Sequence, residues 1–191
     1  MKKSAWLIIP FLLLSACARP AQKPAFQWSE DTHLSAQDKA KYETQISNLQ
    51  HKIDTYRAGS EDGSMYAPIP DFIDRARAHE ALGDYRSALG TYQKGLSLHR
   101  QSQAFIHNMG RLYEKIHDVD SAVAQYRTLV DKYNQPAYLY DITWAYISAG
   151  DRKKAEKAFN EWQNKFHTTD LETQNAIKKL RAQEDKTLNP N

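Results

Sequence analysis

The feature that most constrains the fold is an internal repeat with a period of about 34 residues. Successive shifts of 34 and 33 residues superpose an aspartate, an alanine and an aromatic residue in three copies. These residues are Asp84, Asp118 and Asp151; Ala88, Ala122 and Ala155; and Tyr92, Tyr126 and Phe159. A fixed period of this length is typical of proteins in which one structural unit recurs along the chain.

Within each copy, the spacing predicts two helices joined by a turn. An apolar residue followed four positions later by a small residue marks the first helix: Phe72 and Ala76, Ile106 and Gly110, Leu139 and Thr143. Small side chains let facing helices approach closely, and the aromatic rings of the second helices fill the space between neighbouring pairs. Gly83 and Gly150 suit a left-handed helix end. The three aspartates suit the start of the next helix.

A single helix pair leaves an apolar face in water, so the pairs must stack on one another. This arrangement resembles the tetratricopeptide repeat, a stacking helix–turn–helix unit. The resemblance covers residues 69–168 as three repeats and implies an all-α solenoid. Arg75 and His79 depart from it, because the family prefers an apolar residue and a tyrosine there. The usual proline at the repeat end is absent, and Pro136 is expected to open the third repeat.

The N-terminus has the pattern of a secretory signal. A basic start, Met1-Lys2-Lys3, precedes the apolar residues 5–14 and the small residues Ser15 and Ala16. Ten apolar residues are too few for a membrane-spanning helix, which needs about 20. We therefore predict a cleaved signal peptide over residues 1–16.

Leu14-Ser15-Ala16-Cys17 also resembles the bacterial lipobox at all four positions. The resemblance implies that Cys17 carries acyl chains such as palmitate. Each buried methylene contributes about 0.8 kcal/mol, so two or three chains hold a protein firmly at a membrane. The sorting rule for such lipoproteins implies the outer membrane, because Ala18 is not aspartate, and we expect the protein to face the periplasm. The alternative is an ordinary signal peptide with a chance cysteine.

Residues 17–34 are predicted to form the lipidated cysteine and a tether of at most about 55 Å, at roughly 3.3 Å per residue. A helix is predicted over residues 35–58, with Ser35 and Asp38 resembling a capping box. Its apolar residues follow a heptad spacing: Tyr42, Ile46, Leu49, Ile53 and Tyr56. This seam predicts either packing on the first helix pair or self-association into a homo-oligomer.

A polar loop is expected over residues 59–64, between this helix and the repeats. After the repeats, residues 169–191 are predicted to form a capping helix, started by Thr169 or Asp170, and a frayed tail. The apolar set of this helix is thin: Leu171, Ile177 and Leu180. A mostly polar terminal helix is what a stack needs to end in water.

Charge and motifs exclude several functions. Removal of Lys2 and Lys3 with the signal leaves 24 basic and 23 acidic residues, which gives no electrostatic case for nucleic acid. The seven histidines form no H-x-x-x-H or H-E-x-x-H motif, and no Gly-rich phosphate loop or G-x-S-x-G elbow occurs. We therefore predict no enzyme, metal site or cofactor. An enzyme with scattered catalytic residues, or a glycan-binding protein, is the alternative.

In the family that the repeats resemble, the first helix of each unit lines the concave face. This resemblance implies a groove that binds an envelope protein or peptide. Carried over by position, it contains Ile73, Arg77, Glu80, His107, Asn108, Arg111, Glu114, Tyr140, Asp141 and Trp144. We favour Arg77, His107, Asn108, Arg111, Tyr140, Asp141 and Trp144 as the binding residues of a non-catalytic adaptor. The alternatives are that the final helix covers Tyr140 and Trp144, that Arg77 and Arg111 are solvated charges, and that the chain assembles with itself through residues 42–56.

Overall fold

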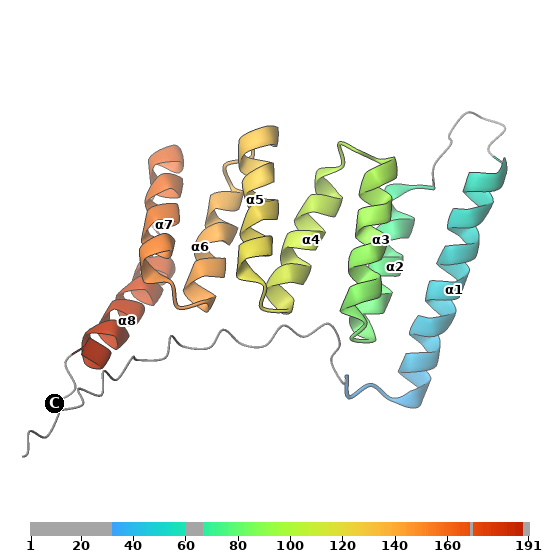
Figure 1. The fold of residues 1–191 in the computed structure, drawn as a ribbon, viewed down its shortest axis with the longest axis horizontal. Coiled ribbons are helices and arrows are strands. Elements are labelled where there is room, and N and C mark those ends of the chain that lie inside the picture. The colour runs from blue at the N-terminus through green and yellow to red at the C-terminus, as the bar shows by residue number, and fades with distance from the viewer. Residues whose placement is uncertain (1–31, 60–66, 169, 189–191) are drawn as a thin grey trace, which may run out of the picture.

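The computed structural model describes residues 32–59, 67–168 and 170–188. These residues form eight α-helices, which Figure 1 shows side by side in chain order. They are α1 (Ala36–Gly59), α2 (Ile69–Ala81), α3 (Tyr85–Leu98), α4 (Gln103–Lys115), α5 (Val119–Tyr133), α6 (Tyr138–Ser148), α7 (Arg152–Phe166) and α8 (Leu171–Leu188). The three predicted repeats are the pairs α2–α3, α4–α5 and α6–α7, so the fold is the expected stack of antiparallel helix pairs.

Several predictions fall outside the described residues. They are the signal peptide, Cys17, the tether as far as residue 31, most of the polar loop and the last three residues of the tail. No helix in the described part of the chain combines the length and apolar character that crossing a membrane requires.

The turn inside each repeat follows the local sequence. Gly83 and Gly150 have φ angles of 74° and 72°, and His117 adopts the same left-handed conformation at 62°. The aspartate after each then accepts a hydrogen bond from a backbone N–H three residues on, over 3.1 Å, 3.2 Å and 3.1 Å in repeats one to three. These caps satisfy backbone donors that a helix start leaves unpaired, and each contributes about 1 kcal/mol.

The core runs the length of the stack without a break. Phe72, Ile106 and Leu139 of the first helices are buried, as are Tyr92 and Tyr126 of the second helices. One cluster contains residues from the four helices α1 through α4, and a second contains residues from α4 through α7. Helix α4 therefore contributes to both. Full burial of each such side chain stabilises the fold by about 1.5–3 kcal/mol.

Helix α1 covers the outer side of the first repeat. Ile53 is only 3% exposed, and Tyr56 packs on the same cluster as α2. Lys52 Nζ of α1 lies 2.8 Å from Asp71 Oδ1 of α2. This is packing on the first helix pair, one of the two alternatives that the heptad spacing left open. Self-association through this helix stays a prediction.

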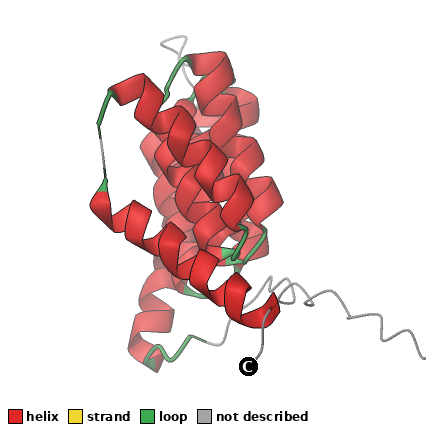
Figure 2. Cartoon of the chain, turned by 90° about the vertical axis from the view of Figure 1, so that its left-hand side faces the viewer, coloured by secondary structure: helices red, strands yellow, loops and turns green. Residues whose placement is uncertain are grey.

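Helix α8 ends the stack and runs obliquely to α7. Figure 2 shows this from the side of the stack on which α7 and α8 lie. Asp170 caps it by accepting a hydrogen bond from the backbone N–H of Thr173 at 2.9 Å. The apolar contact is small and joins Ile177 to Phe159 of α7 and Ala155 beside it.

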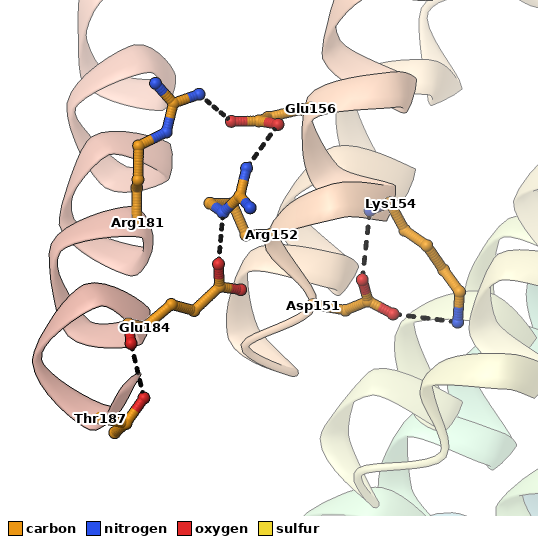
Figure 3. Close-up of polar contacts among 7 residues, drawn as sticks. All are labelled: Asp151, Arg152, Lys154, Glu156, Arg181, Glu184 and Thr187. Atoms are coloured by element: carbon orange, nitrogen blue, oxygen red, sulfur yellow. Dashed lines mark hydrogen bonds and ion pairs between the residues drawn. The ribbon is translucent and has the colours of Figure 1, made fainter. Parts of the chain in front are cut away.

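Ion pairs add to this contact between α7 and α8 (Figure 3). Arg152 Nε lies 2.6 Å from Glu184 Oε2, and Arg152 Nη1 lies 2.8 Å from Glu156 Oε2. Arg181 of α8 reaches the other oxygen of Glu156 at 2.7 Å. Exposed pairs contribute at most about 1 kcal/mol each and weaken in salt.

A glycine substitution tests the close approach of α4 and α5. A Cβ added at Gly110 would lie 2.6 Å from Cε1 of Tyr126, whose ring is fully buried and has no room to withdraw. We expect Gly110→Ala to destabilise the fold by about 1–3 kcal/mol in urea denaturation, in spite of the higher helix propensity of alanine.

The control is Gly90→Ala in α3, where an added Cβ meets no atom within 4 Å. This variant is expected to gain about 0.5–1 kcal/mol from the same helix propensity. Equal gains in both variants would show that the stack does not depend on the close approach at Gly110.

Candidate functional site

A pocket of about 490 Å³ lies between the first helices of repeats one and two. Its lining comes from α2 and α4 alone: Arg77, Glu80, Asn108, Arg111, Glu114 and Lys115. The structure therefore brings together three of the favoured binding residues, Arg77, Asn108 and Arg111. It also adds Lys115, which sequence reasoning missed because it lies at the very end of α4.

The two arginines of the pocket are free to bind a ligand. Arg77 and Arg111 occupy the same position in consecutive repeats, and both side chains are exposed. Neither makes a hydrogen bond or ion pair within the described part of the chain. By contrast, Arg127 and Arg152 are held by glutamates on neighbouring helices. Arg77 and Arg111 thus present guanidinium groups that could each bind a carboxylate in a bidentate manner.

The two glutamates of the pocket are already engaged by buried tyrosines. Tyr92 Oη donates to Glu80 Oε1 at 2.7 Å, and Tyr126 Oη donates to Glu114 Oε2 at 2.9 Å. Burial raises the pKa of both tyrosine hydroxyls well above the ordinary value, so they stay protonated as donors. Each glutamate satisfies a hydroxyl that would otherwise be buried without a partner.

The third repeat replaces this polar pair as a unit. The positions of the glutamate and the tyrosine are held there by Ile147 and Phe159, which pack in the same cluster. The repeat period predicted the aromatic positions, but it did not predict the pairing of tyrosine with glutamate. The sequence does carry a signal for this pair, because repeat three lacks both the glutamate and the tyrosine, at positions 147 and 159.

An aromatic group joins α4 to α5 and α6. The His107 ring lies 5.4 Å from the Tyr138 ring and 6.4 Å from the Tyr126 ring. Burial lowers the pKa of His107, so its imidazole is neutral at neutral pH. Burial raises the pKa of Asp141, although the charge of His107 acts against this.

Trp144 holds in repeat three the position that Arg77 and Arg111 hold in the other repeats. It is half-buried, with its ring 6.3 Å from that of Tyr140. Tyr140 is less available, because its hydroxyl donates to Asp170 Oδ2 at 3.2 Å and its ring lies 5.3 Å from that of Trp162. The residue that precedes α8 thus contacts Tyr140, and both Tyr140 and Trp144 are half-buried, so the alternative that the final helix covers both side chains stays open.

Asn108 is placed differently from the other favoured residues. Its side chain is almost fully buried, and its Nδ2 donates to the carbonyl of Ala104 in its own helix at 2.7 Å. Its Oδ1 and the second N–H of Nδ2 are not used in this bond. Within the described part of the chain, no group of three or more His, Cys, Asp or Glu side chains is placed to hold a metal ion.

The tyrosine–glutamate pair can be tested by copying the third repeat. Tyr126→Phe leaves Glu114 half-buried without its donor, so we expect a loss of about 1–3 kcal/mol in the free energy of unfolding. The double variant Tyr126→Phe/Glu114→Ile removes both polar groups and should recover most of that loss. Urea denaturation measures both. A double variant as unstable as the single one would contradict the coupling.

The pH dependence of stability tests the burial of Glu114. Burial raises the pKa of Glu114 above 4.5, so its contribution to stability is full below that pH and is lost as the pH rises through the higher folded-state pKa. We expect Glu114→Gln to become steadily more favourable, relative to the native chain, from about pH 4.5 to pH 7 in denaturant titrations.

Glu161→Gln is the matched control. The hydrogen bond from Arg127 lowers the pKa of Glu161, so its stabilising contribution is present at neutral pH and is lost as the pH falls. This variant should therefore become less favourable over the same rise in pH. The same pH trend in both variants would refute the effect of burial on Glu114.

Comparisons with known proteins agree with this geometry. A family model described as "Tetratricopeptide repeat" matches residues 76–104, from within α2 through α3 into α4. The crystal structure of a tetratricopeptide repeat protein from Parabacteroides merdae is similar with a TM-score of 0.52 and 18% identity, over 77% of this chain. The match covers 62% of that protein, less than two thirds of its length. No curated protein sequence matches. The match over residues 76–104 and the likeness in fold support an all-α stack of tetratricopeptide-like repeats.

Proposed function

We propose that the chain is a non-catalytic adaptor that binds a segment of another protein along α2, α4 and α6. The observation that carries this proposal is the pair Arg77 and Arg111, exposed and unpaired beside one pocket. Trp144 continues the same row in the third repeat. Arginine and tryptophan are the residues that most often dominate the affinity of protein interfaces.

The groups of the pocket favour binding over chemistry. A general base needs a free side chain within reach of a substrate proton. Glu80 and Glu114 are instead tied to tyrosine hydroxyls, and the ring of His107 is packed against Tyr126 and Tyr138. These contacts fix the shape of the site and leave the arginine side chains exposed for binding.

The second part of the proposal is that lipid on Cys17 holds the adaptor at the bacterial envelope. The support is the sequence of residues 1–17, with its basic start, apolar stretch and lipobox-like end. Ala18 favours the outer membrane, on the side that faces the periplasm. A tether over residues 17–34 would let the repeats meet a partner about 55 Å from the bilayer, at roughly 3.3 Å per residue.

Cell fractionation tests the anchor. Cys17→Ser removes the sulfur that would carry the acyl chains, and we expect the protein to move from the membrane fraction to the soluble fraction. Two or three acyl chains make release of the native chain negligible, so the difference should be nearly complete. A variant that stays with the membrane would contradict the lipid anchor.

In-cell crosslinking tests the binding surface. A photoreactive residue at position 115, in the lining of the pocket, should give a discrete adduct with a partner protein, and the same residue at position 157 of α7 should not. Trp144→Ala should reduce the adduct at least about tenfold, since loss of an aromatic anchor costs 2 kcal/mol or more, while the thermal unfolding midpoint stays within a few degrees. Equal adducts from both positions would place binding elsewhere.

A further inference from the structure

Helix α8 takes the place that the first helix of a fourth repeat would occupy. Along the stack, α4 packs on α3, α6 packs on α5 and α8 packs on α7. A shift of 34 residues from α6 places Thr173 on Leu139 and Ala176 on Ile142. Helix α8 therefore has smaller side chains than α6 at two positions that α6 uses for the core.

The contact between α7 and α8 is incompletely filled. Leu139 and Ile142 of α6 are fully buried at the preceding junction. Between α7 and α8, by contrast, a pocket of about 360 Å³ remains. Its lining includes Phe159 of α7 and Gln174 and Ile177 of α8. Helix α8 thus covers this end of the stack without filling it.

The ion pairs between the two helices involve exposed groups. Arg181 of α8 pairs with Glu156 of α7, and Glu184 of α8 pairs with Arg152 of α7 (Figure 3). The side chains of Arg181 and Glu184 are 60% and 40% exposed. Such pairs contribute little to stability and are screened by salt. An element with few buried contacts opens at a lower free energy than the rest of a fold, so α8 is the element of this stack best suited to open alone.

The surface beneath α8 is apolar. It is formed by Ala155 and Phe159 of α7, and Tyr146, Ile147 and Trp162 pack against the same cluster. A continuous apolar surface of this kind is unfavourable in water. Any segment that covers the surface again therefore favours the opened state of α8.

We propose that α8 is a displaceable cover, and that the surface beneath it is a second docking site for an amphipathic helix of another protein. The fitting helix has large aliphatic side chains where α8 has Thr173 and Ala176, because Leu139 and Ile142 fill those positions at the preceding junction. Such a helix buries more apolar surface than α8, which offsets the cost of displacing α8. The site shares no residue with the pocket between α2 and α4, so this inference does not depend on the proposed function.

A synthetic peptide of residues 170–188 serves as the probe. It carries Thr173→Leu/Ala176→Ile, which copies α6, and Arg181→Ala/Glu184→Ala, which removes the ion pairs from the probe itself. Fluorescence anisotropy measures its affinity for the purified full chain. A second peptide that keeps Thr173 and Ala176 should bind at least about tenfold less tightly, because it buries less apolar surface. Equal binding of the two peptides would overturn the inference.

Loosening α8 in the full chain should strengthen binding of the probe, since the apparent affinity scales with the fraction of molecules in which α8 is open. Arg181→Ala/Glu184→Ala in the full chain should bind the probe at least about fivefold more tightly than the native chain, because two exposed pairs no longer hold α8. The matched control is Lys179→Ala, which removes an exposed charge from the same helix and should bind as the native chain does. Raising the salt from about 50 to 500 mM should strengthen binding to the native chain more than to the double variant.

Hydrogen exchange measured by mass spectrometry locates the bound probe. The backbone amides of α8 should exchange faster when the probe binds, while those of α7 stay protected. Binding that leaves the exchange of α8 unchanged would overturn the inference, as would a lack of binding to both the native chain and the Arg181→Ala/Glu184→Ala variant.

A variant of the first-helix surface separates this inference from the proposed function. Arg77→Glu/Arg111→Glu should bind the probe as the native chain does, because neither arginine lies in the pocket between α7 and α8. A loss of binding in this variant would place the probe on the first helices. That result would overturn the second docking site and leave the adaptor proposal standing.

Discussion

The stack depends on buried aromatic rings seated against small residues of the neighbouring helix. The ring of Tyr126 lies where a Cβ on Gly110 would be, and the ring of Phe105 lies against Gly95 in the same manner. The first contact closes the pair α4–α5, and the second joins repeat one to repeat two. Dispersion attraction weakens quickly with distance. These contacts between a ring and a small residue therefore set the distance between the helices. The spacing of the side chains on the first helices depends on the same contacts.

Burial of tyrosine rather than phenylalanine then has a consequence for binding. A buried hydroxyl requires an acceptor, and in repeats one and two that acceptor is a glutamate from the pocket. Glu80 and Glu114 thereby accept a tyrosine hydroxyl, and within the described residues neither makes an ion pair with Arg77 or Arg111. One hydrogen bond in each repeat thus connects the buried core to the surface on which we propose that a partner binds.

The sequence predicted the features that repeat or that depend on near neighbours. The period located the three helix pairs, and the aspartate caps and left-handed glycines followed from local rules. His117 was aligned with Gly83, but its left-handed backbone was not foreseen, since few residues other than glycine adopt it. The tyrosine–glutamate bonds, the contact of Tyr140 with Asp170 and the ion pairs of Arg152 join residues far apart in the chain. The repeat period alone does not show which distant residues contact one another. Membrane attachment through Cys17 stays a prediction.

The asymmetry of the binding row follows from how the stack ends. The last repeat must accept α8 in place of a further helix pair, and Ile177 of α8 packs where Phe159 and Ile147 lie. A glutamate at position 147 would be covered by that helix, and a buried carboxylate without an adequate partner costs several kcal/mol. The pair at this end is therefore apolar, and the tyrosine–glutamate arrangement stops at repeat two. The difference between repeat three and the first two repeats therefore follows from the helix that ends the stack.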